Sequence, residues 1–190
     1  MPASSSARVL TVEDDPIVRA DLRLILEDAG FDVCPEARDG IEAVELAREH
    51  RPDLILIDLS LPRMDGVEAT RRILHERDVP IVALSGHRSG GVVERAIAAG
   101  AVAHVLKPFG VAHLVGTITG ALADRITRAE TEAEAEAEHR HHLHMIERML
   151  RDGYSEREIC EALPGGRASQ GNDLGSLGAL LGWVRARFGS

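Results

Sequence analysis

The segment that decides the fold is Leu54-Ile55-Leu56-Ile57-Asp58, in which four apolar residues run directly into a carboxylate. Such a short, near-continuous apolar run is typical of a parallel strand that is buried on both faces of a sheet. An aspartate here can simply cap the following loop, but a carboxylate directly after four apolar residues is better explained as a functional acid. The segment therefore predicts an inner strand with an acid at its carboxyl end.

Three more apolar runs end in polar or charged residues. They are residues 9–12 before Glu13 and Asp14, residues 81–84 before Ser85, and residues 101–106 before Lys107. Lys107 is the only lysine among 22 lysines and arginines, and an ammonium and a guanidinium are poorly interchangeable at a tight anionic site. Ligands of open parallel sheets bind outside the carboxyl ends of the strands. We therefore expect the three carboxylates, the Ser85 hydroxyl and the Lys107 ammonium to converge at one edge.

Helices are expected between these strands. They are predicted over residues 16–29, 39–50, 65–76 and 91–99, and again from about residue 111. Residues 31–34 form a further strand, which we place at an edge of the sheet because Pro35 follows it. This alternation predicts an α/β fold with a doubly wound sheet of five parallel strands and right-handed crossovers.

The polar residues also occur in a specific order. The acidic pair Glu13-Asp14 is followed by Asp58 with the extension Leu59-Ser60-Leu61-Pro62-Arg63-Met64-Asp65-Gly66, then by Ser85, and then by Lys107-Pro108. In order and spacing this set resembles the receiver domain of two-component response regulators over about residues 7–123. The resemblance implies a flavodoxin-like sheet with strand order 2-1-3-4-5. It also implies a cis peptide bond at Lys107-Pro108, because only bonds before proline adopt the cis form at low cost.

The resemblance implies a chemistry as well. Asp58 would be the phosphoacceptor, and its donor would be a sensor histidine kinase. Mg²⁺ would be held by Glu13, Asp14, Asp58 and the backbone carbonyl of Ser60. Such a set suffices because Mg²⁺ keeps several of its waters. Lys107 and Ser85 would contact the phosphoryl group that the carboxylate nucleophile accepts.

Several of these positions have alternative interpretations. Asp14 and Asp15 precede Pro16 and can both be helix-start carboxylates, and we expect Asp15 to have that role alone. Ser85-Gly86 is also typical of a plain turn. His104 stands three residues before the lysine, where the family has its switch aromatic, so the resemblance implies a switch made of Ser85 and His104. A histidine in a strand can also be a half-exposed side chain with no such role.

The composition changes outside the receiver-like region. Residues 1–6 are expected to be a disordered N-terminus, and residues 124–150 a helical linker, because glutamates alternate with alanines and both favour helix. Like charges at i,i+4 and the lack of an apolar heptad favour a solvated spacer over a coiled coil. A homodimer through the last receiver helices or through this linker is one expected assembly.

Residues 151–190 are predicted to form a small helical output or interaction unit. Ser155 and Glu158 make a capping box for a helix that ends before Pro164, and Asn172 or Asp173 can cap a last helix. Three interpretations compete: an interaction or dimerisation module, an RNA-binding unit that resembles the ANTAR module, and a helix-turn-helix DNA reader. The receiver also resembles those of the ANTAR group. A nearly neutral tail suits a polyanion poorly, so we place interaction first, RNA second and DNA third.

The composition limits the partners, the metal sites and the cellular location that can be expected. The net charge is −9, which we count as −6 in residues 1–123, −4 in 124–138 and +1 in 139–190. Two distant cysteines, Cys34 and Cys160, offer neither a disulfide framework nor zinc spacing. No apolar run reaches transmembrane length, so we expect a cytoplasmic protein without a membrane partner. The four histidines between His139 and His144 are a candidate metal site, but a polar helix surface is the preferred interpretation.

An enzyme of another class is the distant alternative. Mg²⁺-dependent phosphatases with an aspartyl nucleophile use the same type of sheet, but they normally need a second acid two residues after the nucleophile. Ser60 occupies that position here. We therefore expect no catalysis beyond phosphoryl acceptance by Asp58 and the loss of that phosphoryl group.

Overall fold

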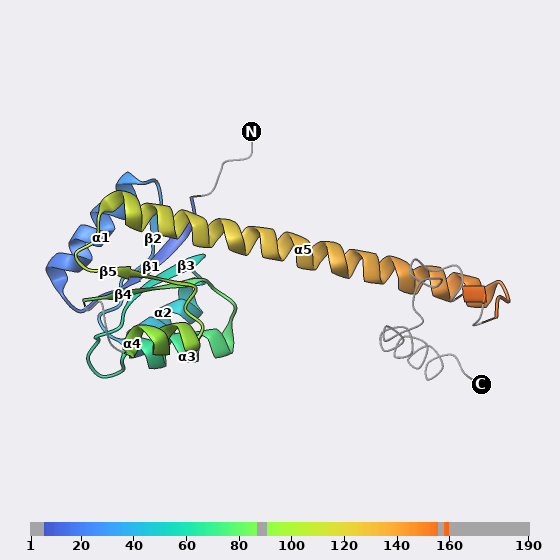
Figure 1. Cartoon of the computed structure of the whole chain (residues 1–190), viewed down its shortest axis with the longest axis horizontal. Coiled ribbons are helices and arrows are strands. Elements are labelled where there is room, and N and C mark those ends of the chain that lie inside the picture. The colour runs from blue at the N-terminus through green and yellow to red at the C-terminus, as the bar shows by residue number, and fades with distance from the viewer. Residues whose placement is uncertain (1–5, 87–90, 156–157, 160–190) are drawn as a thin grey trace. The chain divides into compact units, whose positions relative to one another are not determined.

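The computed structural model describes residues 6–86, 91–155 and 158–159. Over these residues strands and helices alternate, as predicted (Figure 1). The strands are β1 (Arg8–Val12), β2 (Asp32–Val33), β3 (Leu54–Asp58), β4 (Ile81–Ser85) and β5 (Ala103–Leu106). The helices are α1 (Pro16–Asp28), α2 (Gly40–His50), α3 (Gly66–Glu76), α4 (Val92–Ala98) and α5 (Val111–Arg151).

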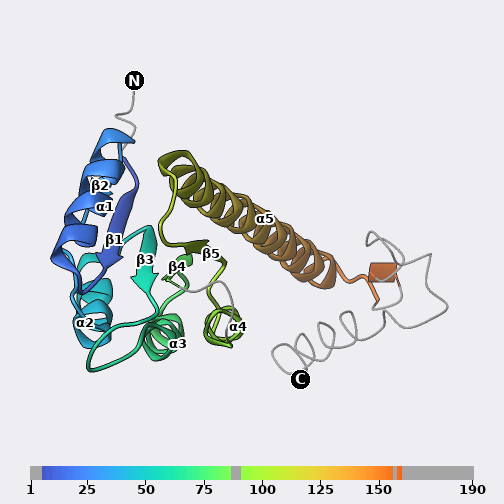
Figure 2. The same ribbon diagram turned by 60° about the vertical axis from the view of Figure 1, so that its left-hand side comes forward.

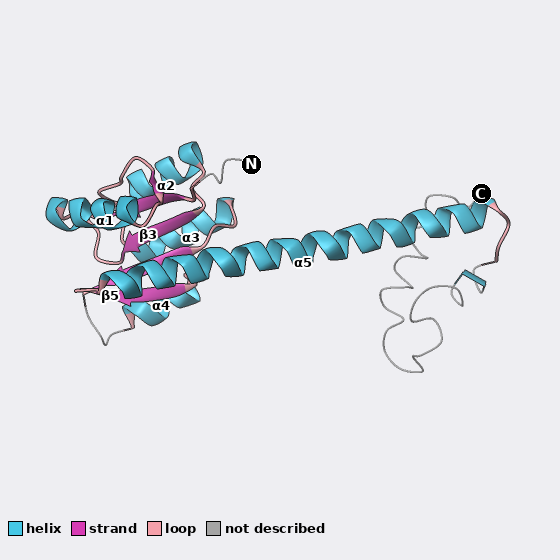
Figure 3. Ribbon diagram, turned by 90° about the horizontal axis from the view of Figure 1, so that it is seen from above, coloured by secondary structure: helices cyan, strands magenta, loops and turns pink. Residues whose placement is uncertain are grey.

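The strands form one parallel sheet with the order β2-β1-β3-β4-β5. This confirms the predicted order 2-1-3-4-5 and the doubly wound fold. Figure 3 shows the sheet from above, with β3 and β5 labelled. β3 lies in the middle, and all five of its residues are buried. β2 lies at one edge, as predicted, but it is shorter than the predicted 31–34 and pairs with β1 over only two residues.

Helices cover both faces of the sheet (Figures 1 and 2). The side chains of Leu54 and Leu56 belong to the cluster that includes residues of α1 and α5, such as Leu22 and Ile118. Ile55 and Ile57 point the other way, into the cluster with residues of α2 and α3. This alternation follows from the two-residue period of a strand. It explains why the β3 run is apolar at every position rather than at every second one.

Aspartates begin three of the helices. The carboxylates of Asp15, Asp39 and Asp65 accept hydrogen bonds from backbone N–H groups in the first turns of α1, α2 and α3. These N–H groups have no partner within the helix, so an N-cap carboxylate stabilises the helix start. For this reason α2 and α3 begin one residue after the predicted starts at 39 and 65. Asp15 has the helix-start role predicted for it.

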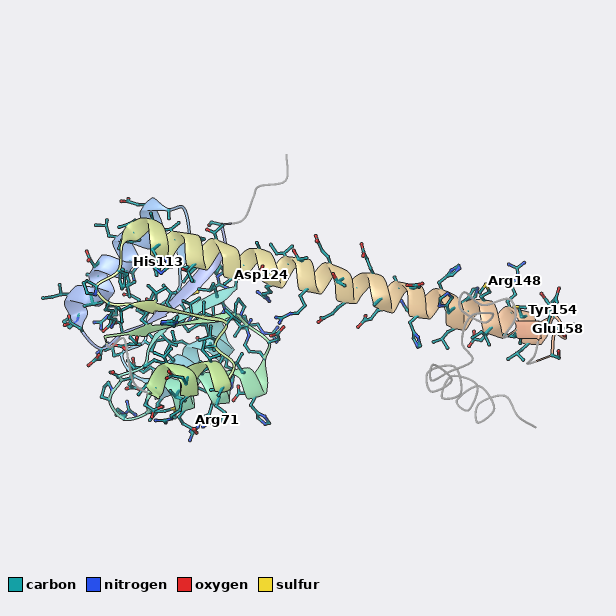
Figure 4. All side chains as sticks on the ribbon, in the orientation of Figure 1. Arg71, His113, Asp124, Arg148, Tyr154 and Glu158 are labelled. Atoms are coloured by element: carbon teal, nitrogen blue, oxygen red, sulfur yellow. The ribbon has the colours of Figure 1, made fainter. Side chains whose placement is uncertain are left out.

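α5 is one continuous helix, where the sequence predicted a last receiver helix and a linker helix after it. Its early residues Leu114 and Ile118 are fully buried, whereas every residue from Ile126 to His141 is exposed (Figure 4). The exposed stretch agrees with a solvated spacer. The chain divides into two compact units, residues 1–128 and 129–190. The boundary thus falls inside α5 rather than after residue 123, and the roles assigned to the segments stay predictions.

The described end of the chain contains part of the predicted output unit. α5 ends before Asp152 and Gly153, and Gly153 has a left-handed φ of 89° that favours glycine. The predicted capping box is present, because the Ser155 N–H donates to Glu158 Oε2 at 2.8 Å. The expectations for residues 1–5, Cys160 and the helix after Asn172 lie outside the described residues. Within the described part, no helix is long and apolar enough to cross a membrane.

Candidate functional site

The predicted site residues lie at the carboxyl ends of four strands. Glu13 follows β1, Asp58 ends β3, Ser85 ends β4, and Lys107 follows β5. Because parallel strands point the same way, these ends meet at one edge of the sheet. Glu13, Asp58 and Ser85 are among the few buried polar residues of the described chain.

Lys107 joins two of the carboxylates. Its Nζ donates to Glu13 Oε2 at 2.5 Å and to Asp58 Oδ2 at 2.7 Å. The Lys107 side chain is 19% exposed, and those of Glu13 and Asp58 are 2% and 8% exposed. Asp14 is exposed, yet one carboxylate oxygen each from Glu13, Asp14 and Asp58 lie within 4.8 Å of one another. The structure therefore brings all three predicted acids and the predicted cation together.

Burial and charge act in opposite directions at this site. Burial raises the pKa of Glu13 above its ordinary value, and the hydrogen bond and charge of Lys107 offset this only in part. Burial by itself would lower the pKa of Lys107, but the hydrogen bonds to Asp58 and Glu13 outweigh it, so the pKa of Lys107 is raised. Lys107 therefore stays an ammonium at neutral pH.

The backbone around Asp58 is tightly packed. The Ser60 N–H donates to Asp58 Oδ1 at 3.0 Å, which orients the carboxylate. The Leu59 N–H donates to the Leu84 carbonyl at 3.0 Å. α3 starts directly against this turn, and a Cβ at Gly66 would lie 2.1 Å from the Asp58 carbonyl oxygen. Only glycine fits at that point, so Gly66 is needed for close approach rather than for flexibility.

The two predicted switch residues lie on neighbouring strands. Ser85 is buried, and its carbonyl accepts the Lys107 N–H at 2.8 Å. The Lys107-Pro108 bond that follows is cis, as predicted. His104 on β5 pairs in register with Ala83 on β4 and is exposed. Since Val105 is buried in the cluster shared with α1 and α5, alternation places His104 on the opposite face of the sheet, on the side of α4.

Arg19 has a contact that the sequence did not reveal. Its guanidinium donates to the Glu13 carbonyl at 2.7 Å and to the Asp14 carbonyl at 3.3 Å. It therefore holds the backbone of the acidic pair from the first turn of α1. A basic residue one turn after an N-cap was the only sequence signal, and many helices carry one without such a contact.

The donor set fits a divalent cation. Three carboxylates and one ammonium leave two formal negative charges at the cluster. All of the potential ligands are oxygens, which Mg²⁺ prefers, and the exposed Asp14 leaves room for retained waters. Within the described residues this is the only group of three or more ligand side chains. The histidines between His139 and His144 form no such group among the described residues, and the preference for a polar helix surface stays a prediction.

The comparisons agree with this geometry. Residues 9–119 match the response regulator receiver domain family. Transcriptional regulatory protein PdtaR of Mycobacterium tuberculosis is 39% identical over 148 residues, which cover 77% of this chain and 72% of that protein. A protein-glutamate methylesterase/protein-glutamine glutaminase of Myxococcus xanthus is 45% identical over 111 residues, 54% of this chain but only 30% of that enzyme.

A solved structure bears directly on the metal. The receiver domain of sensor histidine kinase PA1611 from Pseudomonas aeruginosa, with a magnesium ion coordinated in its active-site cleft, is 33% identical, with a TM-score of 0.57. The match covers 62% of this chain and 98% of that one. With the matched fold, the convergent acids and the single lysine all in place, the chain belongs to the response regulator receiver domain family of two-component systems.

Proposed function

We propose that Asp58 is the phosphoacceptor of this response regulator and that a sensor histidine kinase is its donor. The observation that carries the proposal is the position of the Asp58 carboxylate. It lies between the ammonium of Lys107, 2.7 Å away, and the acidic pair after β1. A buried carboxylate with a cation on one oxygen and a backbone N–H on the other is oriented for in-line attack.

The reaction transfers one phosphoryl group. An Asp58 oxygen attacks phosphorus, a P–O bond forms, and the P–N bond to the donor histidine breaks, with the electron pair leaving on the imidazole. Lys107 then follows the new phosphoryl oxygens, and the Ser85 hydroxyl donates to one of them. Such positioning and charge stabilisation supply most of the catalysis in phosphoryl transfer.

The metal would be held by Glu13, Asp14, Asp58 and the Ser60 carbonyl. When bound, Mg²⁺ neutralises charge on the phosphoryl oxygens. Glu13 is the most buried of these residues and also bonds to Lys107, so it would act through a water, whereas Asp14 and Asp58 would be direct ligands. Once the Ser85 hydroxyl is bonded to the phosphoryl group, the side chain of His104 on the neighbouring strand would move towards Ser85. This movement would change the surface formed by α4 and α5.

The assignment is tested with acetyl phosphate and Mg²⁺. The full chain should take up phosphate, seen as a shifted band on a phosphate-affinity gel or as a mass increase. Asp58→Asn should abolish the uptake, whereas Asp78→Asn, an exposed aspartate paired with Arg128, should leave it unchanged. An Asp58→Asn protein that still takes up phosphate would show that Asp58 is not the phosphoacceptor.

For the output we propose a helical interaction or dimerisation module in residues 151–190. Within its described part, Ile159 is fully buried in an apolar cluster with Ile146 and other residues near the end of α5. Sizing with and without beryllofluoride, which mimics the phosphoryl group on Asp58, should show a homodimer only with the mimic. A change of size that Asp58→Asn also shows would contradict the proposal.

A nucleic-acid output is the second candidate. The PdtaR match spans 148 residues, more than the family match at 9–119, so the likeness to a transcriptional regulator extends beyond the receiver. RNA is favoured over DNA because of the ANTAR resemblance. Filter binding of the beryllofluoride-treated protein to total RNA and to random duplex DNA distinguishes the outputs. Retention of neither, together with dimerisation, supports the interaction module.

Phosphatase activity is the remaining alternative. The position two residues after Asp58 is Ser60, which supplies no second acid. We therefore expect no turnover of p-nitrophenyl phosphate in the presence of Mg²⁺. Multiple turnovers that Asp58→Asn abolishes would replace the signalling role with an enzymatic one.

A further inference from the structure

The loop between β3 and α3, residues 59–65, carries the Ser60 carbonyl and is attached to Asp58. We call it the Ser60 loop. Its two ends are fixed by backbone contacts, since the Leu59 N–H bonds to the Leu84 carbonyl and the Gly66 N–H bonds to the Leu59 carbonyl at 3.3 Å. In the middle of the loop the Ser60 N–H bonds to the Asp58 side chain and Leu61 is buried in the core, but no backbone carbonyl or N–H of the described sheet bonds to residues 60–65. What else holds these residues determines where the Ser60 carbonyl lies relative to Asp58.

Arg63 lies in the middle of this loop in an unusual conformation. Its φ of 63° is in the left-handed region, which is uncommon for a residue with a side chain. The strain costs roughly 1–2 kcal/mol for a non-glycine residue, so the surroundings must stabilise this conformation. The Arg63 side chain is 60% exposed, and burial therefore does not explain it.

Asp39 supplies that stabilisation. The Arg63 guanidinium donates to Asp39 Oδ2 at 2.8 Å. Asp39 Oδ1 accepts the N–H groups of Ile41 and Glu42 at 2.8 and 3.1 Å as the N-cap of α2. The Asp39 side chain is only 6% exposed and cannot move without losing both caps. Arg63 thus bonds to a fixed acceptor on α2.

A second contact joins the loop to the same helix start. The Gly40 N–H donates to the Met64 carbonyl at 3.2 Å. A Cβ at Gly40 would lie 2.5 Å from that oxygen, so glycine permits the close approach. Arg63 and Met64 are therefore both held against residues 39 and 40, three and four residues after Ser60 in the chain.

We propose that Arg63 and Asp39 form a clamp that positions the Ser60 loop for cation binding and phosphoryl acceptance at Asp58. This rests on the function proposed above for Asp58. Both are positioning residues, because neither contacts the carboxylates of Glu13, Asp14 or Asp58 in the structure. A half-exposed ion pair adds little to stability, whereas metal sites and catalytic groups depend on fractions of an ångström in their supports.

The clamp is tested on the full chain with Mn²⁺ as the probe. Free Mn²⁺ is measured by electron paramagnetic resonance, and Mg²⁺ competes for the same site. Arg63→Gly removes the guanidinium but adopts the left-handed φ freely, so the variant should stay folded. Its Mn²⁺ affinity should fall by about tenfold, the lower end of what outer-shell partners of metal ligands contribute. The rate of phosphorylation by acetyl phosphate should fall with it.

Further variants separate positioning from general stability. Arg63→Lys should recover part of the affinity, and Arg71→Ala, which removes an arginine of 62% exposure on α3, should bind Mn²⁺ like the wild type. Asp39→Asn should match Arg63→Gly, and the double variant should be no worse than either, because paired residues are not additive. The thermal midpoint of Arg63→Gly in EDTA should stay close to that of the wild type.

Two results would overturn the clamp, and they are distinguishable. If the wild type binds Mn²⁺ and accepts phosphate, and a folded Arg63→Gly variant does both equally well, the clamp alone is rejected. Wild-type protein that neither binds Mn²⁺ nor accepts phosphate rejects the function proposed for Asp58, and the clamp with it.

Discussion

At the scale of single residues, Lys107 is the cation on which the site depends. Its ammonium lies within 2.7 Å of two buried carboxylates, and no arginine of the described chain shares those contacts. An ammonium is a compact point charge that can follow a moving phosphoryl oxygen, whereas a guanidinium is planar and larger. This difference explains why one lysine persists among arginines.

We therefore predict that Lys107→Ala lowers the rate of phosphorylation by acetyl phosphate by about 100-fold, as loss of a charge-stabilising donor does in enzymes. Lys107→Arg should not restore the rate. Arg128→Ala, at an exposed ion pair with Asp78, is the control and should react normally. A Lys107→Arg protein with the wild-type rate would show that any cation suffices.

Asp39 gives a pH-dependent prediction. Burial acts to raise the pKa of Asp39, but hydrogen bonds from the N–H groups of Glu42 and Ile41 and the charge of Arg63 outweigh it, so the pKa is lowered. A carboxyl whose pKa is lowered by folding adds stability above its unfolded pKa, and this stability is lost as the pH falls through the folded value. Asp39→Asn keeps a capping oxygen but loses the charge. In urea unfolding at pH 7 it should be less stable than the wild type by about 0.5–1 kcal/mol. As the pH falls through the folded pKa of Asp39 the difference should shrink towards zero, and a difference that stays the same across the acid range would contradict this account.

At the scale of elements, the glycines of α3 and α5 serve different purposes. Gly66 begins α3 against the Asp58 carbonyl, with no room for a Cβ. Gly116 and Gly120 lie within α5, and a Cβ at either would meet nothing within 4 Å. Glycine is therefore required for close packing at the start of α3, whereas within α5 it only lowers the stability of the helix.

Matched substitutions should separate the two cases. Gly116→Ala should stabilise the protein by about 0.5–1 kcal/mol, because alanine favours helix more than glycine does. Gly66→Ala should destabilise it by more than about 2 kcal/mol, since the backbone of β3 or α3 must shift. Urea unfolding followed by circular dichroism measures both. Gly66→Ala with wild-type stability would show that the turn after β3 relaxes easily.

At the scale of the whole molecule, the metal site links folding to signalling. Three acids, two directly after β1 and one at the end of β3, are brought together only in the folded chain. A cation that binds them therefore stabilises the folded state by mass action. The net charge of −9 adds a general attraction for cations. Specific binding of a cation by the three acids can therefore be distinguished from this general attraction only with a variant of one of those acids.

Mg²⁺ at ten times its dissociation constant should stabilise the folded protein by about 1.4 kcal/mol, and EDTA should remove this gain. Asp14→Asn changes an exposed side chain and should leave stability in EDTA nearly unchanged, yet it should abolish most of the Mg²⁺-dependent rise in thermal midpoint. Asp78→Asn controls for the loss of one negative charge. An Asp14→Asn protein with the full rise would exclude Asp14 as a ligand.

The order of strands, the acidic cluster and the cis bond at Lys107-Pro108 could all be predicted. The acidic cluster rests on a local pattern, an apolar run and the residue at its end, whereas the strand order and the cis bond were implied by the resemblance to receiver domains. The contacts of Arg19 and Arg63 could not be predicted. Arg19 bonds to a backbone carbonyl, and Arg63 reaches its partner from a backbone with a left-handed φ. Both contacts depend on the conformation of the backbone, which the type of side chain does not indicate.

The sequence by itself determined the parallel sheet and the identity of the acids and the cation. Continuous apolar runs indicate strands that are buried on both faces, and the polar residue after each run identifies the site. The distances within the site were decided by tertiary packing. Glu13 and Lys107 are 94 residues apart in the chain yet share a hydrogen bond, and Asp39 reaches Arg63 only because α2 starts beside the Ser60 loop. Such contacts depend on how helices pack on the sheet, which is a property of the whole fold and not of any segment.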